Sequence, residues 1–163
     1  MKRAILLISA AVLTAVAGSA QAGAKTHLIS PRAALGLHSS AVPQRKQGMV
    51  GTWLATYTIN GNPVAQTFAQ WSKGGTTLQQ NNMAPGEGNF IEGNWGGNGS
   101  AITSSYIGWG YDNDEVSGYF TKVEQVTLNG DSYSGTFELK IYDLDGNLLA
   151  DHSGDVSGTR VSF

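Results

Sequence analysis

The sequence has no cysteine, only three histidines and only four prolines among its 163 residues. Without cysteine the folded protein has no disulfide bonds, so its stability must come from a packed core. His152 is the one histidine after residue 48, and a zinc or copper site of usual composition cannot be assembled from it. We therefore predict no metal site and no cofactor.

Basic residues are scarce in the larger part of the chain. All 12 acidic residues lie from Glu87 onward, and from residue 49 onward only four lysines and arginines oppose them. A region with a net charge of −8 repels a phosphate backbone, so nucleic acid is not an expected partner.

Long apolar runs are lacking except at the N-terminus. Lys2 and Arg3 precede an uncharged apolar run at 4–17, and the small-residue sequence Ala20-Gln21-Ala22 follows it. This layout is typical of a cleaved secretory signal peptide, and the run is shorter than the roughly 20 residues of a membrane-spanning helix. We predict a signal peptide at 1–22, export to the periplasm or out of the cell, and no integral membrane segment after cleavage.

Residues 23–48 differ in texture from the rest of the exported chain. They carry four basic residues and no acid, hold two of the four prolines, and show no sustained helical or strand period. We interpret them as a flexible basic leader. It is either a solvated tether or a segment that touches an anionic surface or the acidic domain at 49–163.

From Met49 onward, short runs rich in Thr, Val, Ile and aromatic residues alternate with turns rich in Gly, Asn and Asp. No stretch has apolar residues at helical spacing over three turns, so the pattern predicts an all-β domain. Turns such as Asn60-Gly61 and Asn129-Gly130 tolerate the positive φ of tight hairpins. Strands are expected at 49–59, 64–72, 75–82, 88–95, 101–111, 115–128, 132–142 and 147–162.

Eight sequential strands joined mainly by short hairpins form an antiparallel up-and-down meander. Closure into a barrel removes both exposed edges, whereas an open two-sheet sandwich would usually need longer crossing connections. We predict an eight-stranded barrel, whose interior is just large enough for side chains or one small ligand.

Two tripeptides mark the ends of this meander, Gly51-Thr52-Trp53 and Gly158-Thr159-Arg160. A Gly-x-Trp opening strand with a late arginine resembles the calycin superfamily of lipocalins, avidins and fatty-acid-binding proteins, and the chain is similar to small bacterial lipocalin-like exported proteins. The resemblance implies that Trp53 closes one end of the barrel with Arg160 packed over its ring, which makes Gly51, Trp53 and Arg160 structural residues. Such a stack stabilises by about 0.5 to 2 kcal/mol.

Aromatic residues are numerous for a small barrel, with four tryptophans and six tyrosines. With Trp53 inward, alternation turns Tyr57 inward on the first strand, and the apolar row of the seventh strand contains Phe137. On the fifth strand the pattern does not decide which row faces inward. We interpret five aromatic residues as candidates for lining an interior ligand cavity: Tyr57, Phe68, Tyr106, Trp109 and Phe137.

No catalytic constellation is evident. Asp151-His152-Ser153 has the residue types of a hydrolase triad, but neighbours along a strand point to opposite faces. The leading hypothesis is an exported lipocalin-like barrel that binds a small, partly hydrophobic or amphipathic molecule in its interior. The alternatives are a non-catalytic envelope-associated structural protein and a small barrel enzyme similar to allene oxide cyclase, an isomerase or cyclase. An inward Glu92, Glu124 or Glu138 beside Tyr106 would favour the enzyme.

Overall fold

A computed structural model describes residues 48–83 and 89–162. The expected signal peptide and almost all of the expected leader lie outside these residues. Within them no helix is long and apolar enough to cross a membrane.

The described chain contains eight β-strands, which confirms the predicted all-β class. The predicted boundaries are close to the observed ones, and the largest shift is at the end of the fourth strand, which continues to Asn98. The strands are β1 (Gly51–Ile59), β2 (Asn62–Trp71), β3 (Thr76–Asn81), β4 (Phe90–Asn98), β5 (Ala101–Asp112), β6 (Glu115–Asn129), β7 (Ser132–Asp143) and β8 (Leu148–Arg160).

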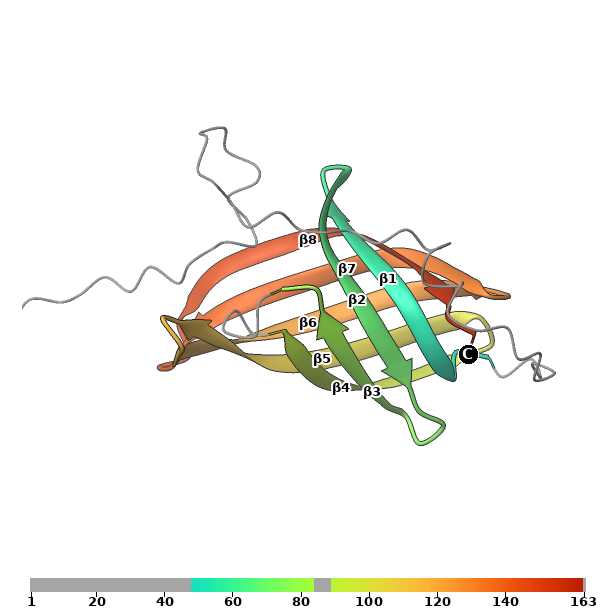
Figure 1. Cartoon of the computed structure of the whole chain (residues 1–163), viewed down its shortest axis with the longest axis horizontal. Helices are drawn as coiled ribbons and strands as arrows, with labels where there is room; N and C mark the ends of the chain where they lie inside the picture. The colour runs from blue at the N-terminus through green and yellow to red at the C-terminus, as the bar shows by residue number, and fades with distance from the viewer. Residues whose placement is uncertain (1–47, 84–88, 163) are drawn as a thin grey trace, which may run out of the picture.

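The strands form a closed antiparallel barrel in simple sequential order. Each strand pairs with the next, and β1 pairs with β8 in a register that places Trp53 opposite Arg160 and Tyr57 opposite Val156. In Figure 1 the long strands β5 to β8 run side by side as one wall, and β1 and β2 cross it steeply. No sheet edge is left unpaired by this order, as the predicted closure requires.

The hairpins use the turn residues that the sequence offers. Asn60 and Gly61 join β1 to β2 with φ of 52° and 76°, and Gly130 joins β6 to β7 with φ of 61°. These conformations are tolerated by glycine and asparagine better than by other residues. The turn chemistry therefore fixes where the strands end.

One end of the barrel interior is filled by aromatic rings, and we call it the aromatic end, formed by Trp53, Trp71, Trp95 and Tyr133. The Trp53 and Tyr133 ring centroids are 5.3 Å apart and those of Trp71 and Trp95 are 5.7 Å apart, both in edge-to-face geometry. Each such pair stabilises by about 0.5–1.5 kcal/mol beyond the area that it buries. The indole of Trp53 also donates a hydrogen bond to the carbonyl of Met49 at 2.9 Å.

Arg160 stabilises the closure of the barrel, where β8 pairs with β1. Its guanidinium lies 4.1 Å from the centroid of the Trp53 ring. It also donates hydrogen bonds to the carbonyls of Val50 and Gly48, at 2.7 and 2.5 Å, and to the Asp131 carboxylate at 2.8 Å.

Gly51 is required beside this arginine for two reasons. Its φ is 135°, and a Cβ atom there would lie 2.7 Å from the Arg160 guanidinium. Gly51, Trp53 and Arg160 thus meet where the barrel closes.

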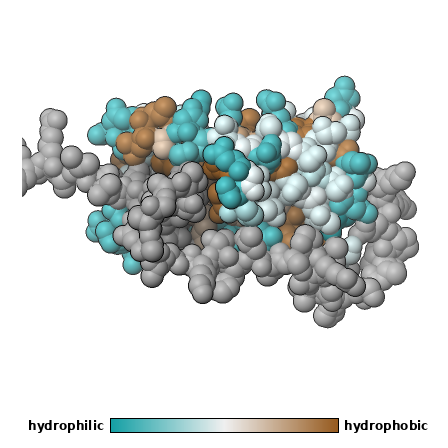
Figure 2. All heavy atoms as spheres, turned by 90° about the horizontal axis from the view of Figure 1, so that it is seen from above, coloured by the Kyte–Doolittle hydropathy of each residue, from teal (hydrophilic) through white to brown (hydrophobic). Residues whose placement is uncertain are grey.

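The outer surface is mixed in hydropathy. Figure 2 shows mainly hydrophilic and intermediate atoms with apolar patches between them. Among the exposed apolar side chains are Phe68, Ile107, Trp109 and Leu148, which are 40–56% exposed.

Candidate functional site

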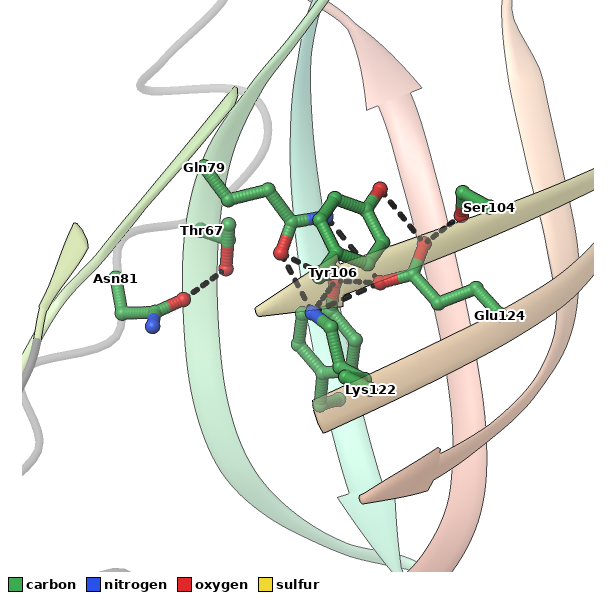
Figure 3. A network of polar contacts seen from close by, with 8 residues as sticks. Thr67, Gln79, Asn81, Ser104, Tyr106, Lys122 and Glu124 are labelled. Atoms are coloured by element: carbon green, nitrogen blue, oxygen red, sulfur yellow. Dashed lines mark hydrogen bonds and ion pairs between the residues drawn. The ribbon is translucent and has the colours of Figure 1, made fainter. Parts of the chain in front are cut away.

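Polar side chains from four strands meet inside the barrel. The register pairs Ser104 with Glu124 and Tyr106 with Lys122 on one face of the sheet, and the burial of all four shows that this face is the inward one. Figure 3 shows Gln79, Ser104, Tyr106, Lys122 and Glu124 pointing toward one another. We call this cluster the central network, and it consists of Tyr57 of β1, Gln79 of β3, Ser104 and Tyr106 of β5, and Lys122 and Glu124 of β6.

Glu124 is the acceptor at the middle of the central network. It is fully buried and forms an ion pair of 2.8 Å with the Lys122 ammonium. The same carboxylate oxygen accepts hydrogen bonds from the Tyr57 hydroxyl at 2.5 Å and the Gln79 amide at 3.2 Å. The other oxygen accepts longer bonds from the hydroxyls of Tyr106 at 3.3 Å and Ser104 at 3.4 Å. Both oxygens of a buried carboxylate are thus compensated.

Lys122 is equally well partnered. Besides its ion pair, its ammonium donates hydrogen bonds to the Tyr57 hydroxyl at 2.8 Å and to the Gln79 carbonyl at 2.5 Å. It also lies over two aromatic rings, 4.1 Å from the Tyr57 centroid and 4.6 Å from the Tyr106 centroid. The Tyr57 hydroxyl therefore bridges the two charges, accepting from the lysine and donating to the glutamate.

Burial shifts the pKa values of the central network. Burial raises the pKa of both Tyr57 and Tyr106 well above 10.0, and the Glu124 charge adds to the effect, so both hydroxyls keep their protons. Burial lowers the pKa of Lys122 below 10.5 although Glu124 opposes this shift. Burial alone would raise the pKa of Glu124, but the Lys122 charge and the donated hydrogen bonds hold it below 4.5. Glu124 is therefore an ionised carboxylate inside the barrel.

Three of the five predicted cavity residues lie in the interior and are brought together. The rings of Tyr57 and Phe137 meet edge to face with centroids 5.2 Å apart. Tyr106 contributes its ring and hydroxyl to the central network, so the inward row of β5 is the one that contains Ser104 and Tyr106.

Phe68 and Trp109 do not line the interior, and the expectation that they do is wrong. They are 40% and 56% exposed on the outer face. Phe68 lies opposite Leu54, on the other face of the sheet from Trp53. The inward row of β2 consists instead of small residues before Trp71, because rings from other strands fill the space in front of them.

Sequence reasoning did not identify Gln79 and Lys122 as site residues. Of the three glutamates whose direction bears on the enzyme hypothesis, Glu124 is the inward one, whereas Glu92 and Glu138 are exposed. The inward row of β6 carries Lys122 and Glu124, while its outward row carries Val123, which is 37% exposed. At these positions charged side chains face inward and an apolar one faces outward, which is the reverse of the usual pattern. The sequence could have revealed this only if it were known which row of side chains faces the interior.

The tripeptide Asp151-His152-Ser153 forms no triad, as expected. His152 lies opposite Leu139 of the inward row, and its neighbours Asp151 and Ser153 are exposed on the outer face. Among the residues that the structure describes, no three histidine, aspartate or glutamate side chains lie close enough to hold a metal ion.

Two shallow grooves lie on the outer wall of the barrel. One, of about 370 Å³, has hydroxyl groups of Thr56, Thr58 and Ser157 in its lining, and the other, of about 510 Å³, includes Gln70, Glu92 and Asn94. Neither contains a member of the central network. The groups whose pKa values are most strongly shifted therefore lie inside the barrel, away from both grooves.

The chemical capacity of the central network is twofold. Its hydroxyl, amide and charged groups can exchange partners with a polar group of a bound molecule, and the Lys122–Tyr57–Glu124 chain can move a proton over short distances.

Comparison with known proteins finds no protein family, no curated protein and no solved structure that matches this chain.

Proposed function

We propose that this protein is an exported, calycin-like barrel that binds a small, partly hydrophobic molecule in its interior. The observation that carries the proposal is the central network, an ion pair with a full set of hydrogen bonds inside a mainly apolar core. Export rests on the signal-peptide pattern at 1–22, and the calycin relation on the Gly-x-Trp opening strand and the late arginine.

Stability alone does not account for such a network. Replacing a buried ion pair by apolar residues of similar volume is often neutral or stabilising by about 1–4 kcal/mol. Groups with strongly shifted pKa values also gather at functional sites. The rings of Tyr57, Tyr106 and Phe137 beside the ion pair give the apolar contact surface that a partly hydrophobic ligand needs.

The test compares the mature protein with the double variant Lys122→Met/Glu124→Leu. Native mass spectrometry of the gently purified protein should show a retained small molecule, and an apolar fluorescent dye should quench the tryptophans with saturable stoichiometry. The double variant should fold and lose both signals. The matched control is Lys140→Met, on the outer face opposite Asp151, which should lose neither. A double variant that binds as well as the unaltered protein contradicts the proposal.

A specific observation also favours a second candidate, an isomerase or cyclase. Glu124 faces inward beside Tyr106, with the Tyr57 hydroxyl between it and Lys122. An enclosed barrel that excludes water and positions one carboxylate can direct an intramolecular rearrangement.

The two functions are separated by the fate of the retained molecule. It is released, purified and incubated with fresh protein, and its structure is determined before and after. Conversion by the unaltered protein and not by Glu124→Gln establishes the enzyme. Recovery of the unchanged molecule supports binding alone.

A further inference from the structure

The outer face of β2 to β5 carries the groove of about 510 Å³. One row of side chains crosses these four strands in direct register, in the order Gln70, Leu78, Glu92 and Ile107. All four residues line the groove. Polar and apolar side chains therefore alternate across it, at the strand spacing of about 4.8 Å.

A second row of the same face presents exposed aromatic rings. Phe68 of β2 and Phe90 of β4 lie on either side of Gln80 of β3. Because one strand separates them, the backbones of the two phenylalanines are about 10 Å apart. Trp109 follows Ile107 by two residues, so it lies on the same outer face of β5. The three aromatic side chains are 40–56% exposed.

The polar groups of the groove are available to a ligand. Among the described residues, none forms a hydrogen bond or an ion pair with the exposed side chains of Gln70, Glu92 and Asn94. Thr76 and Ser105, which are the partners of Asn94 on the two neighbouring strands, add hydroxyl groups. Amides, hydroxyls and one carboxylate thus offer both hydrogen-bond donors and acceptors.

The charge of this face indicates a neutral ligand. Strands β2 to β5 contain no lysine or arginine, and the one acidic residue in the groove is Glu92. An anionic polymer or lipid surface would therefore meet a negative charge and no positive one. A protein partner also fits poorly, because the cores of protein interfaces are depleted of glutamate and serine.

We propose that the outer face of β2 to β5 binds a neutral, extended oligosaccharide chain. A sugar ring with equatorial hydroxyls has apolar C–H faces and a polar rim, which match aromatic rings bordered by amides and hydroxyls. Two successive rings of a β-1,4-linked chain cover the distance from Phe68 to Phe90, so one chain can contact both. A shallow groove along a sheet suits a chain, whereas a small molecule favours a concave pocket.

The binding test uses three neutral hexasaccharides. Cellohexaose and chitohexaose are extended, and maltohexaose, with its α-linkages, is coiled. Isothermal titration calorimetry and ligand-observed NMR measure their binding to the purified protein. At least one of the two extended chains should bind about fivefold or more tightly than maltohexaose. Equal binding of all three, or no binding of either extended chain, overturns the proposal.

Substitutions of the exposed rings locate the binding on this face. Phe90→Ala and Trp109→Ala should each weaken binding of the extended chain by about three- to tenfold, as the loss of one ring contact predicts. The matched control is Leu148→Ala, because Leu148 is 53% exposed on β8, outside β2 to β5. It should bind the chain as the unaltered protein does. An equal loss in Leu148→Ala contradicts the proposed site.

This outer site is independent of the proposed interior binding, and the two can fail separately. Lys122→Met/Glu124→Leu should bind the extended chain unchanged, and Phe90→Ala should still retain the small molecule of the interior in native mass spectrometry. Loss of oligosaccharide binding in the folded double variant would place that binding inside the barrel and overturn the outer site. Loss of the small molecule alone bears on the interior proposal.

Discussion

At the scale of single residues, polar side chains rather than apolar ones distinguish this interior. Glu124 accepts hydrogen bonds from four side chains besides its ion pair with Lys122, and Arg160 holds two backbone carbonyls while stacking on Trp53. The first arrangement compensates a buried charge, and the second ties the two ends of the domain together. The two arrangements differ in how much they stabilise the folded state.

Arg160→Lys tests the second arrangement. Lysine cannot form the forked bonds to Gly48 and Val50 together with the stack, so the variant should lose roughly 2 kcal/mol of unfolding free energy. Asp131→Asn should lose less than about 1 kcal/mol, since the Asp131 side chain is 71% exposed and solvent weakens its ion pair. Urea denaturation measures both, and equal losses would contradict the role given to the backbone contacts.

At the scale of strands, how well each strand could be predicted from the sequence depended on the chemistry of its residues. The strands themselves were predictable because turns such as Asn60-Gly61 and Asn129-Gly130 interrupt the alternation and fix their ends. The inward rows of β1 and β7 were predictable because one face is clearly apolar, with Trp53 and Phe137 as guides.

For β2 and β6 the sequence does not show which row of side chains faces the interior. The reason is side-chain volume on β2 and side-chain charge on β6. The rings of other strands occupy the space in front of β2, so small residues face inward and Phe68 faces outward. On β6 the inward row carries the ion pair, which no local pattern distinguishes from a solvated face. Which partner fills a space, or pairs with a charge, is decided by strands distant in the sequence.

Gly158 of β8 tests this matching of small and large residues between strands. It lies opposite Tyr133 of β7, and a Cβ atom at Gly158 would overlap the Tyr133 ring. Gly158→Ala should therefore lose about 1–3 kcal/mol, because the ring has to move within a packed interior. Gly96→Ala is the control on β4, where a Cβ atom meets nothing within 4 Å, and it should be neutral or slightly stabilising. Thermal unfolding of the two variants should separate them clearly.

At the scale of the whole molecule, the shifted groups predict how stability depends on pH. Glu124 has a lower pKa folded than unfolded, so in the acid range the unfolded state binds more protons and stability falls as the pH falls. Lys122 also has a lowered pKa, which makes stability rise with pH below 10.5. Both groups therefore favour the neutral to mildly alkaline range over acid.

The buried tyrosines reverse the trend in stronger alkali. Tyr57, Tyr106 and Tyr133 keep their protons when folded and lose them above about pH 10 when unfolded, so each removes roughly 1.4 kcal/mol of stability per pH unit there. Urea midpoints measured from pH 3 to 12 should form a plateau with one falling limb at each end. Lys122→Met/Glu124→Leu should flatten the acid limb and leave an alkaline limb, because the tyrosines remain buried. An acid limb of unchanged depth in this variant would assign the acid sensitivity to groups outside the central network.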